Sequence, residues 1–431
     1  MTRSLLFIVV FLSPIVSVLG QTAEDMVKAR QSEQLAVKAY EATSYPEYLT
    51  NMQKANAARP NHPRLVYNLA SAYAVNGQND AALDTLDRLA KMGLYFAIEK
   101  DDDFKVLIPS HRFKAIQAKL VENRKPVNDS TQAVTVDDKT LIIESVAYDA
   151  KTRTFYLGSV HQRKIVAVDK GVATDFSLPS DGLWSVLGMK VDLSRGWLYA
   201  CSSAFPQMRG FTAADKGRSG IFKYDLRTGK LAKKYILPDG NHALGDLELG
   251  RDGSIYTTDS ISPVIYKIDA KRDEIEEFVR SDNFVSLQGL AFAGGDKEIY
   301  VADYSKGIFR INTETKAIIQ LKPADSVTLL GIDGLYFYRG KLIAIQNGVN
   351  PHRVISLTVS GIKNDQIISF KTLEANHADF MEPTLGTLIG DDFYYIANSQ
   401  WPLVNEKAEL NTEQLRPPVV LKLDARKALT K

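Results

Sequence analysis

Six imperfect repeats of alternating apolar and polar residues occupy the sequence after residue 126 and restrict what this chain can fold into. Each repeat has an apolar segment, a polar turn and an aromatic-rich segment, and most continue into a third segment that ends in Asp or Asn. Alternation with a period of two indicates β-strands that bury one face. The repeats begin at Glu144, Leu187, Gly245, Gln288, Asp333 and Leu385.

The repeats start about 40 to 60 residues apart, which fits four-stranded blades joined by loops of variable length. We therefore predict an all-β six-bladed β-propeller over residues 126–431. An open row of blades would expose two unpaired sheet edges, so the ring must close. The last repeat offers only three strands, of which residues 419–424 are the third. We predict that residues 132–136, which precede the first repeat, supply the missing outer strand of the sixth blade.

Residues 21–125 follow helical spacing and predict a small all-α domain ahead of the propeller. In residues 65–93, the small Ala70 and Ala82 allow two helices to approach closely, and Gly77 permits the turn between them. This unit resembles the tetratricopeptide repeat family, which implies a groove for a protein partner. The alternative is a short helical cap that docks on the propeller.

The first twenty residues have the pattern of a secretory signal peptide. Arg3 precedes an apolar run over residues 5–12, and small residues lie just before Gln21. We expect cleavage there, a periplasmic or secreted protein, and no membrane insertion, because the apolar run is too short to span a bilayer. Cys201 is the single cysteine, so neither a lipid anchor at the cleavage region nor an internal disulfide is expected.

The charge of the chain is nearly balanced, with 53 Lys and Arg against 51 Asp and Glu. No local basic stripe is present, so the electrostatic footprint of a nucleic-acid-binding protein is missing from the sequence. We expect a small-molecule partner, with no nucleic acid.

Oxygen-bearing side chains open the predicted first strands of the blades. These strands line the central channel of a propeller, so their first residues should meet at one mouth. The residues concerned are Glu144, Asp246, Gln288, Asp333 and Glu382. Carboxylate and amide oxygens are the ligands that a hard cation such as Ca²⁺ requires. The alternative is that they are hydrogen-bonded strand caps around a water-filled channel.

Two segments, GLAFAGGDKEIYVADYSKGIFRIN and GDLELGRDGSIYTTDS, resemble the senescence marker protein/gluconolactonase-like (regucalcin-like) six-bladed propellers. The resemblance implies that a Glu opening the first blade, an Asn opening the fourth and an Asp opening the fifth bind a divalent metal, with Ca²⁺ expected. Glu144 and Asp333 match this pattern, whereas Gln288 replaces the Asn. A second Asn of the family, used for substrate, aligns with Gly245 and is missing.

Histidines and aromatic loops complete the predicted site. His242 and His377 lie shortly before channel-lining strands, so they are candidates for general acid–base catalysis at the mouth. We predict His242 as catalytic with Asp333, and His377 as a substrate-binding residue with Asp246 and Glu382. Loops over residues 201–219 and 399–417 carry Phe205, Phe211 and Trp401, which would wall the mouth, although structural packing of these rings is an equal alternative.

Together these features favour an exported, divalent-metal-dependent hydrolase that opens a lactone or ester of a sugar acid. A bound metal would polarise the carbonyl group and lower the pKa of a bound water. By the resemblance, Asp333 would accept a proton while contacting the metal. The alternative is a non-enzymatic propeller that binds a glycan, a peptide or an envelope protein, and Gln288 and Gly245 favour it.

Overall fold

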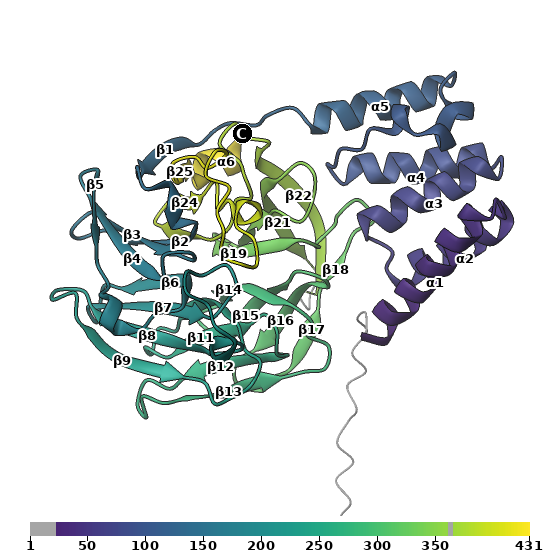
Figure 1. Cartoon of the computed structure of the whole chain (residues 1–431). Helices are drawn as coiled ribbons and strands as arrows, with labels where there is room; N and C mark the ends of the chain where they lie inside the picture. Colours follow the sequence, from purple (N-terminus) through teal and green to yellow (C-terminus); the bar gives the residue numbers. More distant parts are fainter. Residues whose placement is uncertain (1–22, 361–364) are drawn as a thin grey trace, which may run out of the picture.

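The computed structural model describes residues 23–360 and 365–431 of the chain. An all-α domain precedes a six-bladed β-propeller and lies at one side of it (Figure 1). The predicted signal peptide lies outside the described residues. Within the described part, no helix is long and apolar enough to cross a membrane.

Five α-helices and two short 3₁₀ helices form the N-terminal domain, and consecutive α-helices pack against one another. Ala70 and Ala82 are fully buried in one core cluster, as the predicted close approach of their helices requires. The tetratricopeptide identity itself stays a prediction. The helices are α1 (Ala23–Glu41), α2 (Tyr45–Ala58), α3 (Pro63–Val75), α4 (Asn79–Lys91), η1 (Ile98–Lys100), η2 (Asp102–Leu107) and α5 (His111–Asn123).

The strands form six sheets, which confirms the predicted propeller. We number the blades along the chain, and the first strand of each blade is its innermost. Blade 1 contains β2 (Ile143–Asp149), β3 (Thr154–Ser159), β4 (Lys164–Asp169) and β5 (Val172–Asp175). Blade 2 contains β6 (Ser185–Asp192), β7 (Trp197–Ser203), β8 (Ser219–Asp225) and β9 (Leu231–Ile236). Blade 3 contains β10 (Leu244–Leu249), β11 (Ile255–Asp259), β12 (Val264–Ile268) and β13 (Ile275–Arg280).

Blades 4 to 6 repeat this order, with one extra strand in blade 5. Blade 4 contains β14 (Leu287–Ala293), β15 (Glu298–Asp303), β16 (Gly307–Asn312) and β17 (Ile318–Gln320). Blade 5 contains β19 (Ile332–Tyr338), β20 (Lys341–Gln346), β21 (Arg353–Ser360) and β22 (Gln366–Ala375), and its extra strand β18 (Lys322–Pro323) runs parallel to β22. Blade 6 contains β23 (Gly386–Ile389), β24 (Asp392–Ile396), β25 (Val419–Asp424) and β1 (Thr131–Thr135). A last helix, α6 (Ala425–Thr430), follows β25.

The ring closes as the sequence predicts. Strand β1 pairs antiparallel with β25, so that a segment preceding blade 1 forms the outer edge of blade 6. Thr135 lies opposite Val419, and Thr131 lies opposite Lys422. The closing strand removes the free edge that three strands would leave.

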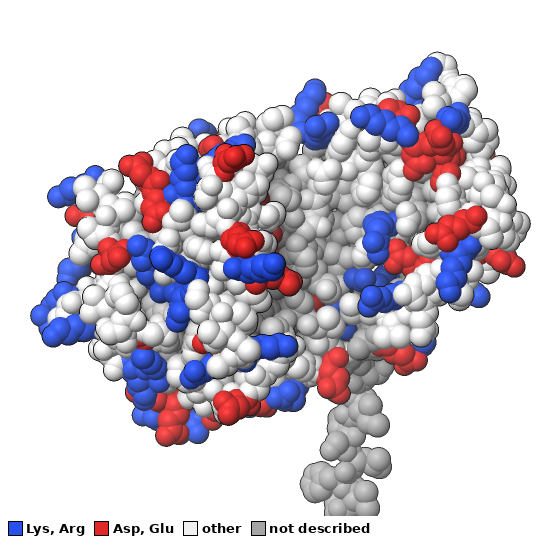
Figure 2. All heavy atoms as spheres, viewed as in Figure 1, with Lys and Arg blue, Asp and Glu red and all other residues white. Residues whose placement is uncertain are grey.

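The helical domain is docked on the propeller through buried polar contacts. Arg353 of β21 is 1% exposed and donates from Nη1 to the carbonyl oxygens of Met92 (2.8 Å) and Gly93 (3.1 Å), just after α4. Asn61 donates to two carbonyls of the loop before β19, and the Tyr95 amide donates to Asn350. Figure 2 shows that the surface is hollowed between the helices and the propeller.

Candidate functional site

A cavity of about 350 Å³ opens at one mouth of the propeller channel. All five oxygen-bearing residues predicted from the sequence line it: Glu144, Asp246, Gln288, Asp333 and Glu382. The structure therefore brings together residues from blades 1, 3, 4 and 5 and from the loop before β23, as six-fold closure requires. The other lining residues are Leu187, Phe205, Gly245, Ser260, Ser286, Tyr304, Asn347, Thr384, Leu385 and Trp401.

Irregularities in the inner strands aim these side chains at the mouth. The pairing of the first two strands shifts between Ile143 and Ser145, between Leu287 and Leu290, and between Ile332 and Leu335. Equivalent shifts occur in blades 2 and 3. A β-bulge leaves a residue unpaired and redirects its side chain. The predicted site residues of blades 1, 3, 4 and 5 all lie within these bulges.

Glycines beside the bulges let the inner strands approach closely. A Cβ atom at Gly188 would lie 2.5 Å from Asp246 Oδ1, and one at Gly289 would lie 2.4 Å from the Leu335 amide nitrogen. In blades 2, 4 and 5 the second bulge residue is Gly, whereas blade 3 has Gly245 first and Asp246 second. Asp246 therefore takes the place of a glycine and points into space that Gly188 leaves open.

Glu144 is a buried carboxylate with one strong partner. Trp401 donates from Nε1 to Glu144 Oε2 at 2.5 Å, and Thr384 donates to the Glu144 backbone carbonyl at 2.7 Å. Burial raises the pKa of the Glu144 carboxyl well above its ordinary range, and the neighbouring Asp333 carboxylate raises it further. The indole hydrogen bond acts in the opposite direction.

Asp333 faces the same cavity from blade 5. Asn347 donates from Nδ2 to Asp333 Oδ2 at 2.8 Å and to the Pro383 carbonyl at 3.0 Å. Burial raises the pKa of Asp333 to about 7, and the Glu382 carboxylate also raises it. A carboxyl group with a pKa near neutrality can accept or release a proton under physiological conditions.

Asp246 and Glu382 add two carboxylates that are incompletely satisfied. Asp246 Oδ2 and Glu382 Oε2 are buried and have no hydrogen-bond partner among the described residues. Burial raises the pKa of Asp246 to about 6 and also raises that of Glu382. Gln288 donates weakly to Ser286 (3.3 Å), and its Oε1 atom faces the open space beside Gly245.

Two of the three aromatic rings that were predicted to wall the mouth do line the cavity. Phe205 and Trp401 both line the cavity and meet edge to face at 5.7 Å. Phe211 instead packs beside the core of blade 2 with Trp184 and does not line the cavity.

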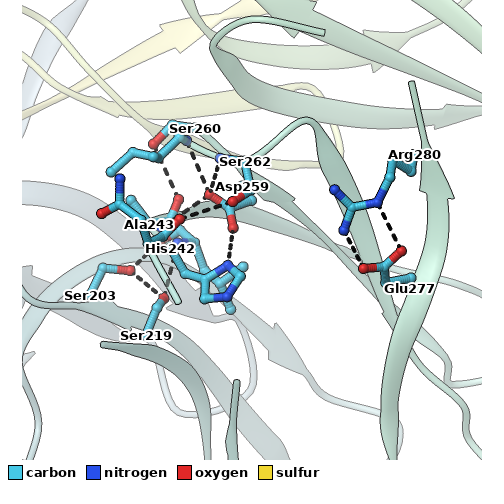
Figure 3. A network of polar contacts seen from close by, with 12 residues as sticks. Ser203, Ser219, His242, Ala243, Asp259, Ser260, Ser262, Glu277 and Arg280 are labelled. Carbon is cyan, nitrogen blue, oxygen red and sulfur yellow. Dashed lines mark hydrogen bonds and ion pairs between the residues drawn. The ribbon is translucent and has the colours of Figure 1, made fainter. Parts of the chain in front are cut away.

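The structure does not bring His242 to the cavity. Its Nδ1 donates to Asp259 Oδ2 at 2.8 Å, and Figure 3 shows the ring held against this buried carboxylate, with the Glu277–Arg280 ion pair on the neighbouring strand. Tyr266 packs edge to face on the ring at 6.1 Å. These contacts hold the ring beside blade 3, and His242 is not among the residues that line the cavity, so its catalytic role stays a prediction.

His377 is also outside the cavity lining. Its Nδ1 accepts a hydrogen bond from the Asp379 amide at 3.1 Å, and its ring packs on Phe380 at 5.6 Å. These local contacts hold the side chain in the turn before blade 6, so the structure does not place it beside Asp246 and Glu382.

Three of the polar cavity residues that were not identified from the sequence share one position in their blades. Ser260, Tyr304 and Asn347 each directly follow the last residue of the second strand of their blade. Tyr304 donates to Asn347 Oδ1 at 3.1 Å and thereby orients the amide that binds Asp333. Their shared position, one residue after the second strand, is the signal that would have revealed them.

The donor set suits a hard cation better than a transition metal. The side chains that line the cavity offer carboxylate, amide and hydroxyl oxygens, and neither His nor Cys is among these lining residues. Two of the buried carboxylate oxygens have no partner among the described residues. No three His, Cys, Asp or Glu side chains of the described part converge tightly enough to form a metal cluster. Glu144, Gln288 and Asp333, the ligands that the resemblance implies, all line the cavity, and the cation itself stays a prediction.

No protein-family model matches the chain, and no curated protein matches it. Solved structures of similar shape include a PQQ-bound aldose sugar dehydrogenase from Streptomyces coelicolor, with 13% identity and a TM-score of 0.47 over 70% of this chain and 98% of that one. A gluconolactonase-like protein has 13% identity and a TM-score of 0.44, over 68% and 90%. Virginiamycin B lyase from Staphylococcus aureus has 17% identity and a TM-score of 0.45, over 62% and 80%. These similarities assign no activity, and the strand pairing itself defines the chain as a six-bladed propeller.

Proposed function

We propose that this protein is an exported, divalent-metal-dependent hydrolase that opens a lactone or ester of a sugar acid at the propeller mouth. The observation that supports this proposal is a group of buried carboxylates with raised pKa values around one cavity. Uncompensated, these groups repel one another and are costly to ionise. A divalent cation would offset that cost.

Each oxygen-bearing residue predicted for the cavity has a defined role in this proposal. Glu144, Gln288 and Asp333 would hold the cation, which when bound would polarise a carbonyl oxygen. Asp333, which faces the cavity and accepts a hydrogen bond from Asn347, would accept the proton of the attacking water, as the resemblance implies. Asp246 and Glu382 accept hydrogen bonds from substrate hydroxyl groups through their unpartnered oxygens.

The cavity is compatible with a small polar substrate. Its volume of about 350 Å³ lies within the range of small-ligand pockets, and its mixed wall of Trp401, Phe205 and carboxylates suits a hydroxylated ring. An aromatic face packs on the apolar face of a sugar while the carboxylates bind its hydroxyl groups.

A second candidate function is non-enzymatic binding of a glycan, peptide or envelope protein. Two observations favour it: Gly245 leaves the mouth without the substrate-binding amide expected from the resemblance, and His242 and His377 are held outside the cavity. Calcium dependence and turnover distinguish the two functions.

The test combines metal analysis, thermal unfolding and hydrolysis. Metal-stripped full-length protein should bind one equivalent of Ca²⁺, melt at a higher temperature in millimolar Ca²⁺, and hydrolyse a sugar-acid lactone in a pH-stat assay. Asp333→Asn should lose the metal and the activity, whereas Glu406→Gln, an exposed carboxylate on the 399–417 loop, should retain both. Calcium binding without turnover of lactones or esters would support the binding function. A melting temperature indifferent to Ca²⁺, Mg²⁺, Mn²⁺ and Zn²⁺ would refute metal dependence.

A further inference from the structure

A second pocket lies between the helical domain and the propeller, and none of the mouth carboxylates lines it. Its volume is about 500 Å³. Residues around the end of α2 and the start of α3 form one wall, and residues of blade 4 and of the segment that leads to blade 5 form the other. The lining differs from that of the mouth, because the cationic side chains Arg59, Lys306 and Lys322 line this space together with the His62 ring.

Lys306 is a buried lysine in the wall of this pocket. It is 4% exposed, and its Nζ atom has no hydrogen-bond partner among the described residues. Its backbone is held in place on both sides, since its amide donates to Asp303 Oδ1 (3.1 Å) and its carbonyl accepts from Gln320 Nε2 (2.7 Å). The Nζ atom lies over the Phe309 ring at 5.8 Å. A buried ammonium without a hydrogen-bond acceptor is costly.

Two further cationic or donor groups face the same space from the helical domain. Arg59 donates from Nη2 to the Ser305 carbonyl at 2.6 Å, while its Nε has no partner in the described part of the chain. The Nδ1 atom of the half-buried His62 ring is likewise unpartnered there. Burial lowers the pKa of Lys306, the Asp303 and Asp25 carboxylates raise it, and Arg59 lowers it. Burial, assisted by Arg59, lowers the pKa of His62 to about 4, so this imidazole is neutral at physiological pH.

The acidic groups nearby leave these cations incompletely neutralised. The buried Asp303 accepts four hydrogen bonds from backbone amides, and Glu33 pairs with Arg64 at 2.9 Å. Asp25 and Asp325 also line the pocket, and Asp25 has an interaction of its own. Neither carboxylate is hydrogen-bonded to Lys306 Nζ.

We propose that this interdomain pocket binds a small organic anion through a carboxylate or phosphate group held by Lys306, Arg59 and His62. Charge-assisted hydrogen bonds to an anion would satisfy Lys306 Nζ and Arg59 Nε, and the neutral His62 ring would donate a third hydrogen bond in the tautomer protonated at Nδ1. The apolar part of the lining suits the carbon skeleton of an organic acid and consists of Ala57, Ala58, Leu321 and Leu329. Because both domains contribute donors, the anion would also fasten the helices to the propeller. The site stands independently of hydrolysis at the channel mouth.

The test uses metal-stripped full-length protein in a buffer free of phosphate and carboxylates. Isothermal titration with inorganic phosphate and with gluconate should each show saturable binding at one site. Lys306→Met, which keeps an unbranched side chain one atom shorter and removes its charge, should weaken binding about tenfold or more, because a charge-assisted hydrogen bond contributes about 1.5–3 kcal/mol. Lys139→Met, which removes one exposed positive charge elsewhere, should bind as the wild type does.

Thermal unfolding without ligand gives a second readout that a purely structural lysine would not produce. Removing an unpaired buried charge should leave the melting temperature of Lys306→Met unchanged or higher. If Lys306→Met does not fold, Arg59→Met should show the same loss of binding. Wild-type protein that binds neither probe at millimolar concentration, or variants that bind both probes as tightly as wild type, would overturn the proposal. Phosphate binding without gluconate binding would assign the site to phosphate groups.

Discussion

Val134 of β1 lies opposite Val420 of β25, and the two buried side chains belong to one core cluster that joins blades 1 and 6. The pair connects a segment that precedes the first blade to the last strand of the propeller. The closing strand therefore contributes apolar burial as well as backbone hydrogen bonds. Loss of this contact should loosen both neighbouring blades together.

Val134→Asp should strongly destabilise the propeller. The substitution places a carboxylate in a site where Val134 is 8% exposed, and an unpaired buried charge of this kind costs about 3 kcal/mol or more. Urea denaturation followed by tryptophan fluorescence measures the change. Ala133→Asp is the matched control, because Ala133 is exposed at the bulge of the same strand and should tolerate the charge. Equal stability of the two variants would contradict closure by β1.

Sequence patterning was sufficient to predict this closure, because each blade needs a fourth strand and one unassigned alternating segment remained. The same reasoning placed Glu144, Gln288 and Asp333 around one cavity. It could not place His242, whose direction depends on the hydrogen bond to Asp259 rather than on its position before β10. Nor did it reveal the bulges, since they are defined by the pairing of two strands and alternation alone does not locate them.

Arg353→Met should weaken the docking of the helical domain. The variant leaves the carbonyls of Met92 and Gly93 and the Gln346 side chain without their donor, because Arg353 serves all three. We expect a loss of about 2–3 kcal/mol in the stability of the interdomain contact. Calorimetry should then resolve an earlier transition for the helices, and limited proteolysis should cleave the linker near residue 126 faster. Arg353→Lys, which retains the charge with fewer donors, should give an intermediate result, and a single unchanged transition would argue against this role.

Glu374 should make stability depend on pH through its contact with the closing segment. Its Oε1 atom accepts from the amides of Asp129 (2.5 Å) and Ser130 (2.6 Å), and burial raises its pKa to about 7. A raised folded-state pKa favours the protonated carboxyl, so the stabilising contribution is complete below the ordinary pKa near 4.5 and is lost as pH rises through about 7.

Glu374→Gln removes this titration while retaining an oxygen that can accept both amides. The free energy of unfolding of wild type minus that of the variant should fall by about 3 kcal/mol between pH 4.5 and pH 8. Urea denaturation at intervals of one pH unit measures the difference, and groups that titrate in both proteins cancel. Glu314→Gln, at an exposed position, should show no such trend. A flat difference for Glu374→Gln would show that the carboxyl titrates at its ordinary pKa.

Gly245→Asn should strengthen cation binding at the channel mouth. A Cβ atom at Gly245 would meet only Gln288 Oε1, at 3.8 Å, so an asparagine has room to bring its amide oxygen beside the proposed ligands. If the cation binds there and the added amide raises affinity tenfold, saturating Ca²⁺ should stabilise the variant by about 1.4 kcal/mol more than the wild type. Gln288→Asn should preserve or tighten binding, because it restores the shorter amide that the resemblance implies.

Gly188→Ala is the steric control for Gly245→Asn. The two glycines occupy neighbouring inner strands, but a side chain has room at Gly245 and none at Gly188. A Cβ atom at Gly188 would lie 2.5 Å from Asp246 Oδ1 and 2.7 Å from Asp246 Cα, so even alanine should displace blade 3 and lower the melting temperature. Differential scanning fluorimetry with and without Ca²⁺ separates the two effects. A Gly245→Asn variant as unstable as Gly188→Ala would show that the mouth has no room for the amide. A stable variant with an unchanged calcium response would instead place any bound cation away from Gly245 and Gln288.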